Sequence, residues 1–309
     1  MRPREWISTE RHAMSSQVSR RAQRVCLVAG LIMVSGLLRA QVTEYQQDQW
    51  LKTPAVTSHV DHVTGNAHSA AYPYRRYCVG CHGELGDGNG ENAEWLDPKP
   101  RDFQLAVFKC RSTPTGTLPT DEDLADTIRR GLDRSNMPPW STFTTQERAD
   151  LVAWIKHYSP RWQNEKAGTP IQIPAEPEIT PDRVKAGQEV YARVQCWKCH
   201  GVTGKANGPS AATLTDDQNR PILPYNFDSG ARPKCGSTDR DLYRIFMTGL
   251  DGTPMPSFAD NIKPEEAWEL VFFLRTLQPP NEFNKKERDI SKQLKLTPIN
   301  PAVAGQSGQ

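Results

Sequence analysis

Apolar side chains recur with the spacing of a helix in two long segments of the chain, residues 144–158 and 264–277. The first segment opens with the capping box Thr144-x-x-Glu147, and the second opens with Pro264, a residue favoured at the first helical position. Each pattern predicts a helix whose apolar stripe faces a core. The stripes consist of Leu151, Val152, Trp154 and Ile155 in the first segment and Leu270, Val271, Phe273 and Leu274 in the second.

Two further segments have the start and stop signals of helices. Residues 120–131 begin with a threonine cap and an acidic first turn and end on a glycine. Residues 183–196 predict a helix that leads into a cysteine-containing motif. By contrast, no stretch alternates between apolar and polar residues for long enough to predict a strand. The predicted fold class is therefore all-α.

An apolar run, Val25–Leu38, follows three arginines near the N-terminus. A charged region before an apolar run of this length is typical of a secretory signal, and the run is short for a membrane span of about 20 residues. We therefore expect residues 1–40 to be a signal peptide cleaved after Ala40, or an uncleaved N-terminal membrane anchor. The predicted location is the periplasm, with membrane association possible through an uncleaved leader or through a complex.

Removal of this leader changes the charge of the chain. The whole chain has 38 basic and 36 acidic residues, of which residues 1–40 contain seven arginines and two glutamates. The rest therefore has 31 basic and 34 acidic residues. No basic stripe remains that would indicate nucleic acid as a partner. Its length, about 270 residues, suggests two domains of ordinary size.

The arrangement Cys-x-x-Cys-His-Gly occurs twice, in "YCVGCHG" at 77–83 and in "QCWKCHG" at 195–201. Such cysteine pairs serve covalent haem attachment, zinc ribbons or dithiol redox sites. Positions i, i+3 and i+4 of a helix lie on one face, so two thiols and one imidazole can address one flat macrocycle. A zinc ribbon would instead need the two pairs to converge across more than a hundred residues. The motifs therefore predict two covalently attached haem groups, bound by Cys78, Cys81 and His82 and by Cys196, Cys199 and His200.

The two motifs open the two copies of an internal repeat. From the histidine onward, "CHGELGDGNGENAEWL" overlays "CHGVTGKANGPSAATL" without a gap, and the pairs "PRDF" with "PYNF" and "FKCRST" with "PKCGST" follow in the same order. This shared order indicates a tandem duplication, with a proline-rich and therefore stiff linker between the copies. The predicted organisation is a signal peptide or anchor at 1–40, a polar lead-in at 41–71, domain 1 at 72–165, a linker at 166–182, domain 2 at 183–280 and a flexible tail at 281–309.

Each half of the repeat resembles a class I cytochrome c, with Cys-x-x-Cys-His near its start, a Gly/Pro loop, a Met-Pro loop and a closing helix. The whole is similar to the tandem dihaem cytochromes c of bacterial respiratory chains, over about residues 72–280. The resemblance implies two domains that each wrap around one covalently bound haem c. It also implies a second axial ligand for each iron, and Met137 and Met255 occupy matching places, each followed by proline. The implied ligand pairs are His82 with Met137 and His200 with Met255.

The family also implies that a proline carbonyl after the motif accepts a hydrogen bond from the ligand histidine. Pro98 is the candidate in the first half, with Pro100 as the alternative. In the second half the alignment has a gap, and Pro209, Pro221 and Pro224 all stay open.

The resemblance implies an electron carrier rather than an enzyme. With histidine and methionine as axial ligands, neither iron has an open position for a substrate. We expect the protein to carry electrons one at a time between a donor and an acceptor protein of a respiratory chain. The alternatives are the cytochrome subunit of a larger oxidoreductase complex, or a dihaem enzyme such as a peroxidase or a thiosulfate-type dehydrogenase.

Some residues do not fit the repeat. Pro73 aligns with Tyr191, inside the helix that should precede the first motif, and predicts that this helix is short or kinked. His59, His62 and His68 cluster upstream in polar surroundings without helical periodicity, so we expect them to be exposed and to bind nothing.

Two cysteines, Cys110 and Cys235, remain once the leader and the motifs are accounted for. They occupy matching places in the two halves. In an oxidising compartment spare thiols often pair, yet equivalent positions of two repeats can equally point apart. The sequence leaves this disulfide open.

Overall fold

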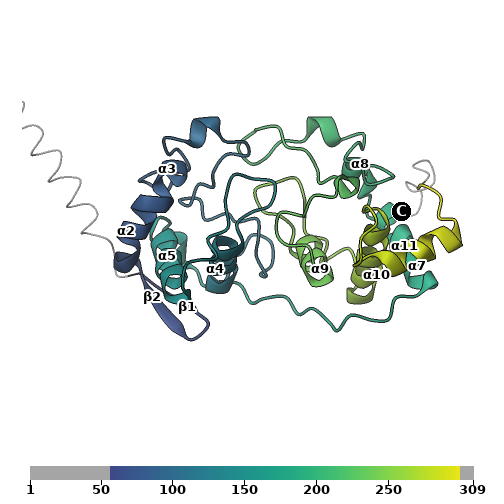
Figure 1. Ribbon diagram of the computed structural model, residues 1–309, viewed down its shortest axis with the longest axis horizontal. Helices are drawn as coiled ribbons and strands as arrows, with labels where there is room; N and C mark the ends of the chain where they lie inside the picture. The colour runs from purple at the N-terminus through teal and green to yellow at the C-terminus, as the bar shows by residue number, and fades with distance from the viewer. Residues whose placement is uncertain (1–55, 300–309) are drawn as a thin grey trace, which may run out of the picture. The chain divides into compact units, whose positions relative to one another are not determined.

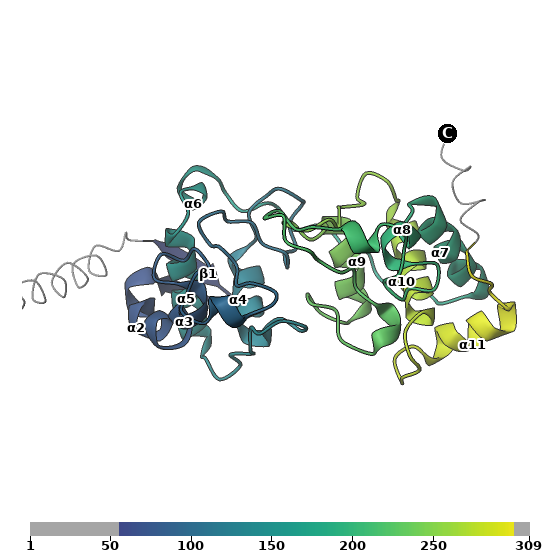
Figure 2. The same ribbon diagram turned by 90° about the horizontal axis from the view of Figure 1, so that it is seen from above.

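The computed structural model describes residues 56–299, so the leader predicted over residues 1–40 lies outside the described residues. The chain divides into two units, Met1–Thr53 and Pro54–Gln309, and everything described here belongs to the second. This unit contains two helical halves, coloured purple to teal and green to yellow in Figures 1 and 2. None of the helices between residues 56 and 299 is long and apolar enough to cross a membrane.

The first half is built around one central helix, α5, which packs against α2, α4 and a short hairpin (Figure 1). The apolar stripe predicted for α5 is confirmed, because all four of its residues are buried. The elements are β1 (Thr57–Val60), β2 (Val63–Asn66), α2 (Ala67–Tyr77), α3 (Val79–His82), η1 (Ala93–Trp95), α4 (Asp121–Arg130), α5 (Thr145–His157) and α6 (Arg161–Asn164).

The hairpin of β1 and β2 was not predicted, and it lies within the segment expected to be a polar lead-in, residues 41–71. The strands pair antiparallel from Thr57 opposite Asn66 to Val60 opposite Val63, which makes each too short to show an alternating pattern. The Ser58 hydroxyl donates a 2.6 Å hydrogen bond to the carbonyl of Ala149 on α5. The hairpin therefore belongs to the first half, and α2 begins five residues before the expected boundary at residue 72.

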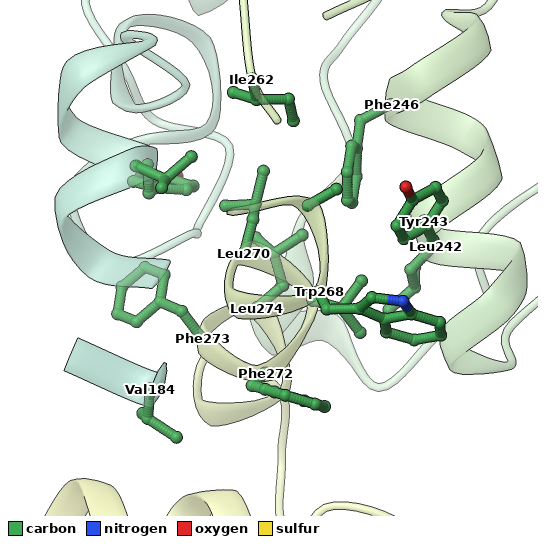
Figure 3. Close-up of a cluster of buried hydrophobic side chains, with 14 of the residues drawn as sticks. Val184, Leu242, Tyr243, Phe246, Ile262, Trp268, Leu270, Phe272, Phe273 and Leu274 are labelled. Atoms are coloured by element: carbon green, nitrogen blue, oxygen red, sulfur yellow. The ribbon is translucent and has the colours of Figure 1, made fainter. Parts of the chain in front are cut away.

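The second half has a similar centre, in which α10 packs closely against α7. A Cβ at Gly187 on α7 would overlap the Glu269 carbonyl of α10, so this close approach requires glycine. Figure 3 shows the apolar residues of α10 between those of α7 and α9. The elements are α7 (Pro181–Arg193), α8 (Trp197–His200), η2 (Ala211–Thr213), η3 (Phe227–Ser229), α9 (Asp239–Thr248), α10 (Pro264–Thr276) and α11 (Lys285–Leu294).

The start and stop signals read from the sequence are confirmed in both halves. Thr120 caps α4 with a capping box, and Gly131 ends that helix. Thr144 and Glu147 form the capping box of α5, and Pro264 is the first residue of α10.

The expectation of a flexible tail over residues 281–309 is wrong for α11. This helix packs against α7 and α10, and its Ile290 is buried. The Arg288 guanidinium donates to the Thr276 carbonyl near the end of α10. The helix is so rich in charged residues that its single buried apolar position does not stand out in the sequence.

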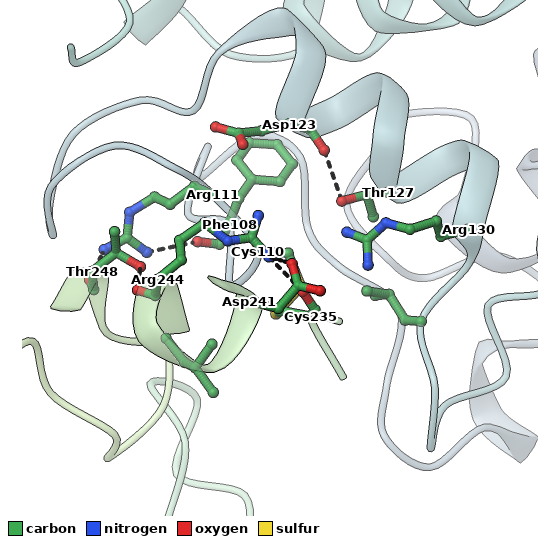
Figure 4. The surroundings of a disulfide bond; sticks show 12 residues. Phe108, Cys110, Arg111, Asp123, Thr127, Arg130, Cys235, Asp241, Arg244 and Thr248 are labelled. Carbon is green, nitrogen blue, oxygen red and sulfur yellow. Dashed lines mark hydrogen bonds and ion pairs between the residues drawn. A yellow bond between two sulfur atoms is a disulfide. The ribbon is translucent and has the colours of Figure 1, made fainter. Parts of the chain in front are cut away.

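The halves are joined by a disulfide between Cys110 and Cys235, whose Cα atoms lie 5.2 Å apart (Figure 4). Beside it the buried side chain of Arg111 forms a 2.7 Å ion pair with Asp251 and donates a 2.6 Å hydrogen bond to the carbonyl of Thr248. The pairing that the sequence left open is therefore formed, and it sits within a polar interface between the halves.

Candidate functional site

The first Cys-x-x-Cys-His motif forms a tight helical turn at the end of α2. Cys78 ends α2 and begins α3, and its carbonyl accepts hydrogen bonds from the amides of Cys81 and His82. Gly83 ends α3 with φ of 78°, in the left-handed region that favours glycine. The turn thus brings both thiols and the imidazole to one short segment, as the spacing predicts.

The imidazole of His82 is held by its Nδ1 atom. Nδ1–H donates to the Arg101 carbonyl at 3.1 Å, and the ring stacks on Phe103 with the centroids 4.4 Å apart. This bond fixes the tautomer and leaves the Nε2 lone pair available to a metal. Burial lowers the pKa of His82 to about 4, so the ring is neutral at physiological pH, as a ligand must be.

The second motif repeats this arrangement. The Cys196 carbonyl accepts from the amides of Cys199 and His200, and Gly201 ends α8 with φ of 81°. The His200 Nδ1–H donates to the Tyr225 carbonyl at 2.8 Å, and burial lowers the pKa of this histidine too. Both halves therefore present a neutral imidazole with Nε2 available.

The proline candidates for the histidine partner are wrong. Neither Pro98 nor Pro100 accepts from His82, and none of Pro209, Pro221 and Pro224 accepts from His200, because the acceptors are Arg101 and Tyr225. Each acceptor directly follows a proline, Pro100 or Pro224, in the aligned quartets "PRDF" and "PYNF". The match of these quartets was the signal for the acceptor position.

A buried tyrosine supports each motif from the preceding helix, and the sequence reasoning did not identify it. The hydroxyl of Tyr74 donates to the Gly83 carbonyl at 2.8 Å, and that of Tyr191 donates to the Gly201 carbonyl at 2.7 Å. Tyr191 is therefore the counterpart of Tyr74, and the alignment of Pro73 with Tyr191 is one residue out of register.

The register shift has a local cause. The second half has one extra residue between the helix and the motif, Gln195, which adopts a left-handed φ of 60°. Pro73 itself lies within α2, which runs unbroken for 11 residues.

Met137 and Met255 lie in loops with the same hydrogen bonds. Each methionine carbonyl accepts from the amide of a leucine five residues earlier, at 3.1 Å for Met137 and 3.0 Å for Met255. Each methionine amide donates at 3.2 Å to a hydroxyl two residues earlier, that of Ser135 or Thr253. Both side chains are half-buried. The two methionines are thus presented by equivalent loops.

The state of the motif cysteines argues against a dithiol redox site. Burial raises the pKa of the Cys78 and Cys196 thiols to about 12, whereas a reactive dithiol needs a lowered pKa. Among residues 56–299, no group of three or more His, Cys, Asp or Glu side chains is placed to hold a metal ion. The donor set of each half, two thiols, one neutral imidazole and one thioether, fits a covalently bound haem.

The three upstream histidines, His59, His62 and His68, are exposed, as expected. The Nδ1 atom of His59 lies 3.3 Å from the hydroxyl of Thr64 across the hairpin.

Comparisons with known proteins agree with this donor set. The family model described as "Cytochrome c" matches residues 184–278, and that described as "Cytochrome C oxidase, cbb3-type, subunit III" matches residues 65–155. A chain of the reducing HAO-like protein complex of Kuenenia stuttgartiensis is 40% identical, with a TM-score of 0.65. The match covers 67% of the present chain and 94% of that chain.

This chain belongs to the cytochrome c family. It is a tandem cytochrome c, with one Cys-x-x-Cys-His motif in each matched segment. Cytochrome c domains carry covalently bound haem c and transfer electrons. A search of the curated proteins finds no match.

Proposed function

We propose that this tandem cytochrome c is an exported, periplasmic electron carrier that holds two haem c groups. The first haem would be attached through Cys78 and Cys81, with His82 and Met137 as axial ligands. The matching residues of the second half are Cys196, Cys199, His200 and Met255. The carrier would pass single electrons between a donor and an acceptor protein of a respiratory chain.

The roles of the chain's own residues follow from the site. When bound, haem supplies an iron that alternates between the ferrous and ferric states. The carbonyls of Arg101 and Tyr225 orient the imidazoles and increase their basicity as ligands. Met137 and Met255 would each supply a thioether ligand to their iron, and this neutral donor would favour the reduced state and so raise the potential.

The observation that carries the proposal is the equivalence of the two sites. Both imidazoles donate from Nδ1 to a backbone carbonyl, and both Met loops close with the same pair of hydrogen bonds. An enzyme that used one haem for catalysis would need an open or unusual axial position at that site, so equivalent donor sets favour a carrier over a dihaem enzyme.

The number of haem groups is tested by the mass of the denatured holoprotein, because covalent haem survives denaturation. We expect two haem groups per chain. Replacement of Cys196 and Cys199 together by Ala should remove one haem, and the same double replacement of Cys78 and Cys81 should remove the other. The matched control replaces Cys110 and Cys235 by Ser and should retain both. A double variant of either motif that kept two attached groups would contradict the assignment.

A second candidate function is that of an electron-transfer subunit in a larger oxidoreductase complex. The observation that favours it is the 40% identity to a chain from a solved structure of a reducing HAO-like protein complex. The native mass of the protein purified gently from its source cells decides between the two. A mass near that of one mature chain with its haem groups supports a free carrier, whereas a stable larger assembly supports the subunit.

A further inference from the structure

Two arginines cross between the halves beside the predicted haem ligands. Arg101 supplies the carbonyl that accepts from His82, yet its guanidinium reaches the second half, 3.9 Å from the Asp217 carboxylate. The same guanidinium lies 3.1 Å from where a Cβ of Gly252 would stand. Gly252 precedes Met255 by three residues. The side chain next to the first imidazole thus contacts the Met loop of the second half.

The opposite contact is made by Arg134, which precedes Met137 by three residues. Its guanidinium carbon lies 5.3 Å from the centre of the Tyr225 ring, within the range of a cation–π interaction. Tyr225 supplies the carbonyl that accepts from His200. The Met loop of the first half therefore contacts the residue next to the second imidazole.

These contacts are related by the internal repeat. Arg101 and Tyr225 are equivalent in the aligned quartets, and Arg134 and Gly252 occupy equivalent places before the methionines. In each direction the residue that accepts from the histidine lies against the Met loop of the other half. Arg101 does so at Gly252 and through its ion pair with Asp217, whose amide donates to the Gly252 carbonyl at 3.4 Å, whereas Tyr225 meets Arg134 in a cation–π contact. The same pair of positions is used twice with different side chains, and both contacts lie in an interface that the Cys110–Cys235 disulfide closes.

The two hydrogen bonds that close each Met loop come from within the loop itself. The loop of Met255 is also held to the first half by Asp251, which pairs with Arg111, whereas the equivalent Asp133 in the loop of Met137 is exposed. The loop of Met137 therefore depends more on a contact from the other half. A thioether is a weak, neutral donor, and its occupancy of an axial position depends on how well the protein positions it. A contact from the other half supplies such an anchor.

We propose that Arg101 and Arg134 are positioning residues for the two Met loops. Arg134 holds the loop of Met137 against Tyr225 of the second half, and Arg101 of the first half holds the loop of Met255. The proposal rests on the proposed function, because it requires the two methionines to be axial ligands. It makes the ligation of each haem depend on the presence of the opposite half.

The test is imidazole binding to the ferric holoprotein, because imidazole reaches an iron only when its methionine leaves. Arg134→Met should increase the imidazole affinity of the first haem about threefold, as expected for the loss of one exposed cation–π contact. Arg101→Met should increase that of the second haem by a smaller factor, because Asp251 still holds the loop of Met255 to Arg111. The affected haem is identified by comparison with Met137→Ala and Met255→Ala, which each open one site. Arg240→Met, which removes an exposed positive charge from α9, is the matched control and should change neither affinity.

The loss of a positive charge near a haem could by itself change imidazole affinity, and Arg101 lies among other charged groups, Lys109, Asp216 and Arg220. Arg134, which makes a cation–π contact, allows the effect of charge to be separated from that of position. Arg134→Lys keeps the charge but loses the planar group that stacks on Tyr225. It should therefore behave like Arg134→Met. An affinity equal to that of the unaltered protein would overturn the positioning role, and so would unchanged affinities in Arg101→Met and Arg134→Met. If Met137→Ala and Met255→Ala instead left both haems unchanged, the assignment of the methionines as ligands would itself fail.

Discussion

The two halves present their histidines in the same way but close the core behind them differently. In the first half the closing helix α5 carries Ala149 and Ala153, both fully buried, where the hairpin lies against it. In the second half the equivalent positions of α10 carry Trp268 and Phe272, also buried. A face that the backbone of a hairpin covers requires small residues, whereas a face without a hairpin is filled by large ones.

The closing helices also differ where they contact the haem motifs. Gly86 of the first half packs against the ring of Tyr158, whereas its counterpart Gly204 packs against Leu277. Tyr158 donates to the Glu84 carbonyl and accepts from the indole of Trp154, contacts that a leucine cannot make. The contact of the closing helix with the haem motif is therefore partly polar in the first half and apolar in the second, while the histidine and methionine positions are the same.

The largest effect is expected where side chains alone fill the core. Trp268 is 1% exposed and packs on Tyr243 with ring centroids 5.1 Å apart. Trp268→Ala should lower the free energy of unfolding of the holoprotein by about 3–5 kcal/mol, because it leaves a large cavity. Denaturant titration measures this, with Trp95→Ala at a 79% exposed position as the control. Similar losses in the two variants would show that Trp268 does not close the second core.

An intermediate effect is expected at the interface, where the two halves also differ. The side chain of Arg111 is fully buried against Asp251, whereas the equivalent residues of the other pair are Gly236 and the exposed Asp133. Arg111→Met should lower the free energy of unfolding by about 3 kcal/mol, because it leaves the Asp251 carboxylate without its buried ion-pair partner. Denaturant titration measures this.

The matched comparison for this interface uses the two aspartates. Asp251→Asn should destabilise the protein, since Asp251 also accepts from Thr115 and from the Gly116 amide, whereas Asp133→Asn should not. Equal unfolding free energies for these two aspartate variants would mean that the halves are equivalent at this interface.

The smallest effect is expected at the hairpin. Ser58 is fully buried, and its hydroxyl donates to the Ala149 carbonyl. Ser58→Ala should lower the free energy of unfolding, measured by denaturant titration, by about 1 kcal/mol, the net contribution of one buried hydrogen bond. Thr57→Ala, at an exposed neighbouring position, serves as the control. If the stability of Ser58→Ala matched that of the control, the hairpin would not close the first core through this contact.

The haem motifs and the closing helices could be predicted from the sequence because their signals are local. Caps such as Thr120 and Thr144 and the spacing of Cys78, Cys81 and His82 depend on neighbours within a few residues. The expectation of two cytochrome c domains is confirmed by the family matches.

The parts that could not be predicted depend on long-range contacts. Asn66 and Asp150 are paired by a hydrogen bond across 84 residues, and neither belongs to a pattern that announces the hairpin. The acceptor Arg101 bonds through its backbone, which leaves no trace in residue type. The disulfide between Cys110 and Cys235 spans 125 residues, and only the folded arrangement of the halves decides whether such cysteines meet.

The central claim, a carrier with two six-coordinate haem irons, is tested most directly by a redox titration of the holoprotein with carbon monoxide added at the reduced end. With His82 and Met137 on one iron and His200 and Met255 on the other, we expect two high-potential waves and little carbon monoxide binding at neutral pH. Stoichiometric binding of carbon monoxide to one haem, or one strongly negative wave, would contradict the account and indicate a catalytic centre.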